Sequence, residues 1–394
     1  MIEPSAGSKS ASEMHLVDLR RDLHRHPELR FEEHRTAGLL SSRLREAGFT
    51  VREGIGGTGV VGTLGSGEPY VVLRADMDAL PVQDAKKGDH ASTRPGVSHA
   101  CGHDVHMTVV MGVAERLAAR TGPGRVGVIF QPAEERPFGE PSGAAAMLAA
   151  DVFDGRTPDV ILGLHCWPDL PAGTVGVDER VAMGAKDAFR VHYRGRAAHA
   201  ATPSRGRDAI LGMAQLVTTL HQNVARSIDP SDAVALNIGT IAGGASQSVV
   251  ASEARITGTV RTIDVGVRAR LRGVIEQTVT GVAASSGLTD ELTWADEMPP
   301  VLNEPRLVER AIAVVARTIG SEHVQRLTSP PMTADDFALF GQLAPTLYLK
   351  LGVAGSGPWP ALHSGTFDVD ERCIETGVDV LAALVSDILQ HPLE

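Results

Sequence analysis

Four short apolar runs constrain the fold of this chain more than any other feature. They span residues 70–75, 126–130, 160–164 and 346–351, and helical patterns lie between them. Runs of this length, bounded by polar and glycine-rich segments, are typical of buried strands. Because strands alternate with helices, the sequence predicts an α/β fold with a mixed, largely parallel sheet flanked by helices.

Polar residues follow each of these runs. They are Asp76, Asp78, Glu134, Glu135, His165 and, in the loop beyond the fourth run, His363. In an open α/β sheet, residues just beyond the carboxyl ends of the strands converge on one edge, where ligands bind. The plainer explanation is that these residues are solvated loop carboxylates, which would have no reason to gather at one edge of the sheet. We therefore expect these side chains to lie close together.

The segment 98–107 reads S-H-A-C-G-H-D-V-H-M and holds several metal-binding side chain types around one glycine. They are Cys101, His103, Asp104 and His106. Thiolate, imidazole and carboxylate groups are the usual ligands of first-row divalent metals. A lone buried histidine or cysteine is more often part of the core, but a contiguous cluster favours a metal site. A helix is predicted directly after the cluster, and its N-terminus is expected to lower the pKa of the thiol.

The pattern of predicted strands and helices changes in the middle of the chain. Residues 184–296 show alternating strands and two helices in the order β-α-β-β-α, which indicates an inserted α+β lid or dimerisation domain. Residues 1–183 and 297–394 would then form one catalytic metal-binding domain. With 394 residues, the chain exceeds the size at which a single core keeps growing, so two domains are expected.

Composition excludes some partners. A formal net charge of −11 provides no basic surplus for binding nucleic acid or an anionic membrane. The three cysteines have no spacing typical of a disulfide framework, and no apolar run reaches the length of a membrane span. These observations predict a cytoplasmic protein without nucleic-acid or membrane partners.

The adjacent Glu134 and Glu135 suggest two different roles. In extended backbone their side chains point to opposite sides, so one can bind metal while the other stays free as a general base. A metal-bound water is acidified toward neutral pH, and a nearby carboxylate can take its proton and pass it to a leaving amine. The alternative is an acidic pair that complements a helix N-terminus. Five donors, with one glutamate among them, would suffice for two metals that share a ligand.

Several motifs together resemble a known family. They are L-H-R-H-P-E-L from Leu23, R-A-D-M-D-A-L-P from Arg74, H-A-C-G-H-D from His99, Q-P-A-E-E from Gln131, G-L-H-C-W-P-D-L-P from Gly163, G-R-A-A-H-A-A-T-P from Gly195 and L-H-S-G-T-F-D-V-D-E from Leu362. On these motifs the chain resembles the dinuclear metallo-amidohydrolases and exopeptidases, which include aminoacylase and carboxypeptidase G. It is most similar to their hippurate hydrolase and auxin-conjugate amidohydrolase branch.

The resemblance implies a role for each matching residue. The implied ligands of two divalent ions, zinc, manganese, cobalt or nickel, are Cys101, His103, Glu135, His165 and His363. Glu134 matches the general base, and Asp78 matches a residue that supports the site. Asp76 stands where other branches carry a ligating histidine, so we leave it out of the ligand set.

The resemblance also implies roles for residues of the inserted domain. His199 is similar to a histidine that reaches across a homodimer to polarise the scissile carbonyl. The plainer explanation for His199 is that it is a buried histidine at the end of a strand. Arg261 matches an arginine that binds the substrate carboxylate. Ser248 stands where relatives have asparagine, and Asp335 stands where close relatives have glutamate.

One further departure lies beside the paired glutamates. Relatives carry a glycine-rich stretch there, whereas this chain has R-P-F-G-E-P-S-G from Arg136, which adds bulk and charge near the mouth of the site. The motifs predict a metal-dependent hydrolase of the amide bond in N-acyl amino acids or amino-acid conjugates. Two alternatives stay open: a dipeptidase or carboxypeptidase of the same family, and a catalytically inactive metal-dependent ligand-binding protein.

Overall fold

The computed structural model describes residues 11–120, 122–136 and 139–393. It contains an eight-stranded sheet in the order β1-β2-β4-β3-β5-β14-β6-β13. In that order the strands are β1 (Thr50–Ile55), β2 (Gly59–Ser66), β4 (Gly124–Gln131), β3 (Tyr70–Asp76), β5 (Val160–Pro171), β14 (Thr346–Ala354), β6 (Val175–Asp178) and β13 (Val324–Leu327). The central pairs β4·β3, β3·β5 and β5·β14 are parallel, as is the edge pair β6·β13. The predicted α/β fold with a mixed, largely parallel sheet is confirmed.

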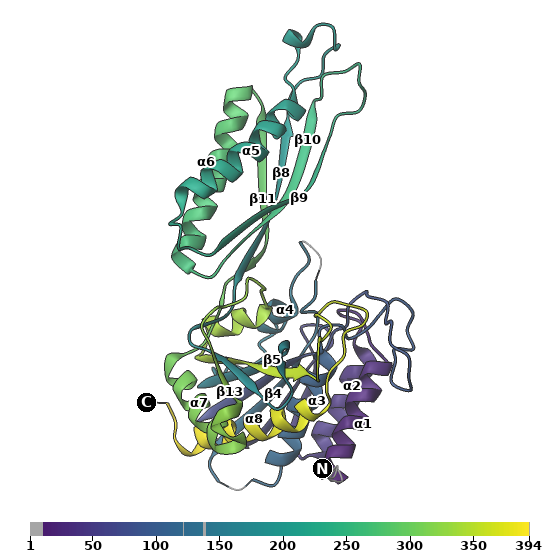
Figure 1. Ribbon diagram of the computed structural model, residues 1–394, viewed down its shortest axis with the longest axis vertical. Helices are drawn as coiled ribbons and strands as arrows, with labels where there is room; N and C mark the ends of the chain where they lie inside the picture. Colours follow the sequence, from purple (N-terminus) through teal and green to yellow (C-terminus); the bar gives the residue numbers. More distant parts are fainter. Residues whose placement is uncertain (1–10, 121, 137–138, 394) are drawn as a thin grey trace.

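Helices cover this sheet, and we call the sheet with its helices the large unit (Figure 1). The helices are α1 (Ala11–Arg25), α2 (His34–Glu46), α3 (His103–Leu117), α4 (Gly143–Ala149), α7 (Pro305–Ile319) and α8 (Arg372–Gln390), with the 3₁₀ turns η2 (Ser321–His323) and η3 (Asp336–Gln342). Every residue of β3 is buried, as expected for a strand covered on both faces. In the described part of the chain, no helix combines the length and apolar character that crossing a bilayer requires.

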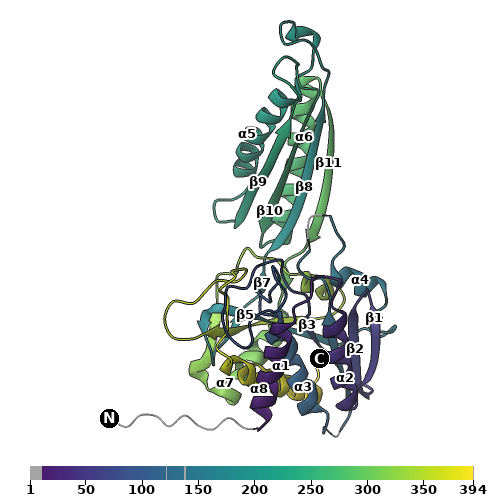
Figure 2. The ribbon, with the colours of Figure 1, turned by 90° about the vertical axis from the view of Figure 1, so that its right-hand side faces the viewer.

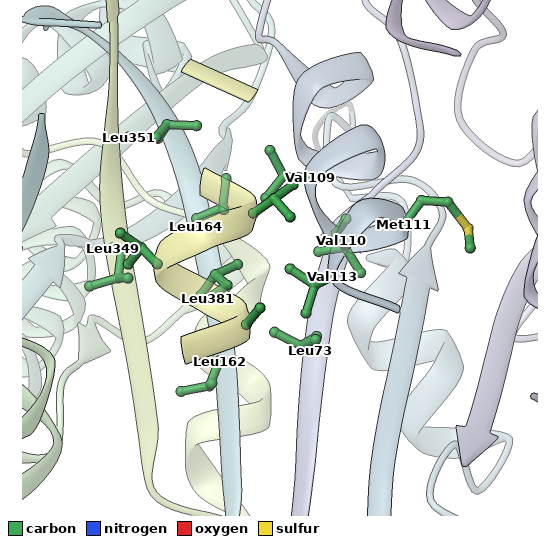
Figure 3. Close-up of a cluster of buried hydrophobic side chains, with 14 of the residues drawn as sticks. Leu73, Val109, Val110, Met111, Val113, Leu162, Leu164, Leu349, Leu351 and Leu381 are labelled. Atoms are coloured by element: carbon green, nitrogen blue, oxygen red, sulfur yellow. The ribbon is translucent and has the colours of Figure 1, made fainter. Parts of the chain in front are cut away.

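One face of the sheet carries the main hydrophobic core. Val109 and Val113 of α3 and Leu381 of α8 pack against Leu73 of β3 and Leu162 of β5 (Figure 3). A second apolar cluster lies between the sheet, α4 and η3. Because both faces are held in this way, the carboxyl ends of the strands keep a fixed position.

A second, smaller layer begins where the chain leaves the large unit, and we call it the insert. It is a four-stranded antiparallel sheet in the order β11-β8-β10-β9 with two helices on one face (Figure 2). Its elements are β8 (Ala185–Arg194), the 3₁₀ turn η1 (Pro203–Arg205), α5 (Ala209–Ser227), β9 (Val234–Gly243), β10 (Glu253–Thr262), α6 (Val265–Ser286) and β11 (Thr289–Met298). A short pair, β7 (Val181–Met183) and β12 (Val301–Leu302), lies near the two crossings between the layers.

The strand β11 is absent from the predicted order β-α-β-β-α. It pairs with β8 and forms one edge of the insert. Its sequence, T-D-E-L-T-W-A-D-E-M, has acidic residues at four positions, three of them exposed and one buried, and so lacks the apolar run typical of a predicted strand. The boundaries 184–296 remain a prediction, and the elements of the insert run from Ala185 to Met298.

Candidate active site

Three segments that are distant in sequence meet beyond the carboxyl ends of β4 and β14. The Nε2 atom of His363 lies 2.8 Å from an Oε atom of Glu135 and 3.3 Å from the Sγ atom of Cys101. His363 follows β14, Glu135 follows β4, and Cys101 precedes α3. The expected convergence of these polar residues at one edge of the sheet is present.

The remaining two predicted donors join the same group. The Nε2 atom of His165 lies 3.5 Å from the Sγ atom of Cys101. Ligand atoms of Cys101, His103 and His165 lie within 4.8 Å of one another, and so do those of His103, Glu134 and Glu135. We call Cys101, His103, Glu135, His165 and His363 the donor cluster.

Fixed hydrogen bonds orient the two buried histidines. The Nδ1 atom of His103 lies 2.8 Å from the carbonyl oxygen of Asp78, and the Nδ1 atom of His165 lies 2.8 Å from that of Cys166. Both rings therefore turn their Nε2 atoms toward the cluster, as metal-binding histidines do when their other nitrogen is held by a carbonyl. Among the described residues, the buried Nε2 atom of His103 has no hydrogen-bond partner. This orphaned atom and the mixed donors fit a divalent metal centre.

Asp78 fixes the backbone of the paired glutamates. Its carboxylate accepts the N–H groups of Glu134 and Glu135 at 3.0 and 2.9 Å. Ala133, just before the pair, has φ 50° in the left-handed region, and its N–H donates to the buried Glu33 at 3.0 Å. The pair lies in a bend and not in the extended backbone assumed from sequence.

The paired glutamates nonetheless face different partners. Glu135 contacts His363, whereas the carboxylate of Glu134 lies within 4.8 Å of those of Asp335 and Asp336. Burial, together with Asp335 and Glu135, raises the pKa of Glu134 well above its ordinary value. A carboxylate whose proton affinity is raised in this way is suited to proton transfer near neutral pH.

The prediction for the thiol of Cys101 was wrong. Burial, followed by the charges of Glu135 and Glu134, raises its pKa well above the ordinary value. The positive end of α3 therefore does not outweigh burial and two adjacent carboxylates. A cation bound in the cluster would restore the thiolate, because metal coordination deprotonates thiols.

A buried ionic network beneath the cluster was missed from the sequence. Arg74 of β3 is 1% exposed and donates to Asp76 at 2.7 Å, to Asp336 at 2.9 Å and to Gln131 at 2.8 Å. Asp335 lies 3.3 Å from the same guanidinium group. A charged residue inside an otherwise apolar run was the one local signal for this network.

Two members of the histidine-rich segment lie outside the donor cluster. His106 is 2.6 Å from Asp76 through Nδ1, and its Nε2 accepts the N–H of Cys166 at 2.8 Å. Asp104 lies 2.7 Å from His24 and 2.8 Å from Arg20. Both nitrogens of His106 are thus engaged, and Asp76 contacts Arg74 and His106. Ligand atoms of Asp76, His103 and His106 also lie within 4.8 Å of one another, so the omission of Asp76 from the ligand set stays a prediction.

A cavity of about 270 Å³ opens from the cluster toward the insert. The large unit contributes Glu134, Trp167 and Leu362 to its walls, besides the donors. The insert contributes Arg261, whose Nη1 donates to the carbonyl of Met332 at 2.8 Å. Arg261 is therefore placed where a substrate beside the cluster would lie.

His199 and Ser248 do not reach this cavity. The N–H of Ala200 donates to the carbonyl of Ser248 at 3.0 Å, so the two loops lie together. His199 follows the end of β8 at Arg194, and Ser248 precedes the start of β10 at Glu253, which pairs with Arg194. The opposite ends of these strands carry Lys186 and Arg261 at the cavity. Eight residues of strand separate the two ends, or roughly 26 Å. Both residues are exposed, so the alternative of a buried strand-end histidine does not hold for His199.

Comparisons with known proteins agree with this geometry. Residues 72–387 match the model of peptidase family M20/M25/M40. The chain is 34% identical over 370 residues to the N-acetyl-L-cysteine deacetylase of Bacillus subtilis (strain 168), covering 93% of this chain and 86% of that protein. It is 32% identical over 370 residues to thermostable carboxypeptidase 2 of Saccharolobus solfataricus, covering 92% of each.

A solved structure shows the same architecture. A Bacillus subtilis protein described as a dinuclear metal binding peptidase of the M20 family superposes with a TM-score of 0.82 at 30% identity, covering 97% of this chain and 99% of that one. This likeness and the donor cluster support a centre for two divalent metal ions. The chain belongs to peptidase family M20/M25/M40, a family of dinuclear metal-dependent hydrolases.

Proposed function

We propose that this protein hydrolyses the amide bond of N-acyl amino acids or related amino-acid conjugates. The observation that carries the proposal is a half-buried glutamate, Glu134, that makes no contact with His363, unlike its neighbour, and lies beside the donor cluster. Cys101, His103, Glu135, His165 and His363 would hold two divalent ions. When bound, such ions acidify water and polarise a carbonyl group.

Glu134 acts as the proton carrier. Its carboxylate accepts a proton from the attacking water as the new C–O bond forms, and delivers that proton to the amine nitrogen as the C–N bond breaks. Burial and Asp335 raise the pKa of Glu134, so its carboxylate is suited to taking up a proton and releasing it again. Asp78 keeps the base in place through the backbone N–H groups of Glu134 and Glu135.

Arg261 binds the free carboxylate of the substrate. Its guanidinium group lines the cavity and donates one hydrogen bond to a carbonyl, which leaves other N–H groups for a carboxylate. Ser248, which replaces an asparagine amide of relatives, has shorter reach and lies at the far end of the insert.

The active unit is a homodimer in which His199 of one chain serves the cavity of the other. The strand length between Arg194 and the cavity supports this, because His199 cannot reach the donors of its own chain. The edge strand β9 carries no further strand on its outer side within the described sheet. Exposed apolar side chains at the same end of the insert suit a contact with a second copy; they are Ile210, Leu211, Ile241 and Val249.

The physiological metal is zinc, manganese, cobalt or nickel, all of which accept thiolate, imidazole and carboxylate ligands. The proposed location is the cytoplasm, since the three cysteines are all free and buried. A dipeptidase or carboxypeptidase activity is the second candidate, and the similarity to thermostable carboxypeptidase 2 favours it. The third, a binding protein without turnover, has less support because the donors and Glu134 are all in place.

A Glu134→Gln variant tests the proposal. The metal-loaded variant should keep its metal and lose about 10²- to 10⁴-fold in kcat on N-acetyl amino acids, the usual contribution of a general base. Glu53→Gln, on the exposed strand β1, is the matched control and should match wild type. Wild-type turnover by Glu134→Gln would rule the role out. Turnover of dipeptides but not N-acyl amino acids by wild type would establish the second candidate, and tight binding without turnover the third.

A further inference from the structure

The wall of the cavity that faces the donor cluster is strongly cationic. Arg136, Lys186 and Arg261 all line it, and we call these three residues the cationic wall. Arg136 follows the paired glutamates in the large unit, whereas Lys186 and Arg261 belong to β8 and β10 of the insert. The sequence had already marked Arg136 as an unusual charge at this place, and the proposed hydrolysis of a simple N-acyl amino acid makes no use of it.

In the part of the chain that the structure describes, one carboxylate of this wall pairs with these cations. Asp296 lies 2.9 Å from Arg136 and 3.2 Å from Lys186. Within the described residues, Arg261 makes no ion pair, and burial lowers its pKa without an acidic neighbour to offset the effect. Three cations against one carboxylate leave an excess of two positive charges on this side of the cavity.

The other acidic residues of the cavity do not neutralise this excess. Glu135 contacts His363, and Asp335 lies 3.3 Å from the buried Arg74. The carboxylate of Glu134 lies on the donor side, within 4.8 Å of ligand atoms of His103 and Glu135. The acidic residues on the donor side of the cavity therefore already have partners there. The cationic wall is available to bind an anionic ligand.

The strand register places two of these cations directly opposite each other. Lys186 and Arg261 are paired residues on the adjacent strands β8 and β10. Directly opposed like charges destabilise a sheet unless an anion lies between them. Of these two opposed cations, Lys186 is the one that pairs with Asp296, so a ligand carboxylate beside Arg261 would relieve the repulsion.

We propose that the substrate carries two carboxylates: one bound by Arg261, as above, and a second bound by Arg136 and Lys186. The substrate class is then an N-acyl derivative of an acidic amino acid, or an amino acid whose acyl group is itself a dicarboxylic acid. Both share the same chemistry, an amide in a molecule with two carboxylates. This inference rests on the proposed amide hydrolysis and names its substrate class.

The position of the second subsite gives it a further property. Arg136 comes from the large unit and Lys186 from the insert, so an anion held by both would bridge the two layers across the cavity. A neutral group in the same place would leave Asp296 as the one carboxylate beside Arg136 and Lys186 among the described residues. Discrimination between an acidic substrate and its neutral amide should therefore be large, because charge-assisted hydrogen bonds are the stronger kind.

Two isosteric substrate pairs test the proposal with the metal-loaded wild-type enzyme. N-acetyl-L-glutamate is compared with N-acetyl-L-glutamine, and N-succinyl-L-alanine with its terminal amide, N-succinamoyl-L-alanine. The acidic member of one pair should have a kcat/KM at least about tenfold higher. Preference in the first pair places the second carboxylate on the amino acid, and preference in the second places it on the acyl group.

Substitutions test whether the cationic wall causes the preference for the acidic substrate. Arg136→Gln and Lys186→Gln should each raise KM for the preferred acidic substrate by about tenfold and leave its neutral partner nearly unchanged. Arg136→Lys should recover part of the loss. Arg194→Gln is the matched control, since Arg194 lies on the same strand β8 as Lys186 but outside the cavity, where it pairs with Glu291.

Calorimetric binding separates this inference from the proposed function. The Glu134→Gln variant should bind the acidic member of the preferred pair at least about tenfold more tightly than the neutral one. Equal affinity within both pairs, or an equal loss on acidic and neutral substrates in Arg136→Gln and Lys186→Gln, would overturn the second carboxylate. Selective binding of the dicarboxylate without turnover by wild type would instead support the subsite and reject amide hydrolysis.

Discussion

The donor end of the large unit and the far end of the insert hold polar residues under opposite conditions. In the large unit, Cys101, His103 and His165 are buried and are placed by strands with a core on both faces. At the far end of the insert, His199 and Ser248 lie on exposed loops. Both sets were assigned to one site by motif. The difference teaches that the first set comes together within one chain, whereas the second lies far from that chain's own cavity and would meet a cavity only in the proposed homodimer.

The largest effect is expected when substitutions of His199 and Glu134 are placed on different chains of one dimer. His199→Ala should lower kcat by about 10²- to 10³-fold, the usual effect of losing a donor to the developing oxyanion. When His199→Ala and Glu134→Gln chains are coexpressed, mixed dimers should regain activity, because one of their two sites keeps both residues. Random pairing gives about a quarter of the wild-type activity.

The control for this experiment is a mixture of the two variants purified separately and kept as stable homodimers, which should stay inactive. Wild-type activity of His199→Ala alone, or no recovery in the mixed dimers, would remove the cross-chain role. In that case the far end of the insert would have no part in the site.

The second difference concerns stability. Arg74→Met should lower the free energy of unfolding by about 3–5 kcal/mol, because it leaves Asp76, Asp335 and Asp336 buried without their cation. Burial already raises the pKa of Asp336 to about 6 with Arg74 present. Urea unfolding at a fixed metal concentration measures the effect, since bound metal adds its own stability. A loss below about 1 kcal/mol would show that the network is hydrated in solution.

The apolar surface of the insert provides a third test. Leu211 is 69% exposed at the start of α5, and Leu211→Asp should shift the protein from dimer to monomer in light scattering. Activity should fall in parallel, since His199 then has no second cavity to enter. Leu343→Asp, at an exposed apolar position of the large unit, is the control and should stay dimeric and active. A fully active Leu211→Asp monomer would contradict the proposed assembly.

The smallest effect is expected on the outer face of the insert. Arg194 and Glu291 form a 2.8 Å ion pair with both side chains about half exposed. Arg194→Ala should change the free energy of unfolding by at most about 1 kcal/mol, because exposed pairs are solvated and screened by salt. The same urea unfolding applies, and a loss as large as that of Arg74→Met would mean that this face is covered in solution.

Much of the large unit could be predicted from the sequence because its signals are local. Apolar runs mark β3, β4, β5 and β14, and the polar residues that follow them meet at one edge. The strand β11 was missed because two pairs of adjacent acidic residues interrupt its apolar residues. The network of Arg74 with Asp336 joins residues 262 positions apart, and no local pattern reports such a pairing.

Electrostatic details were also beyond the sequence. The pKa of Cys101 depends on how deeply the thiol is buried and on the approach of Glu135, which the helix position alone does not reveal. Asp296 was missed for a similar reason, since its role comes from contacts with Arg136 and Lys186 across two layers. These are long-range distances that only the fold determines.

The metal content of the purified protein tests the central claim most directly. If the donor cluster holds a pair of ions beside Glu134, elemental analysis should find two divalent ions per chain in wild type and in Glu134→Gln. His165→Ala and His363→Ala should each retain fewer. A wild-type chain that binds no divalent ion, or two ions kept in both histidine variants, would contradict the account.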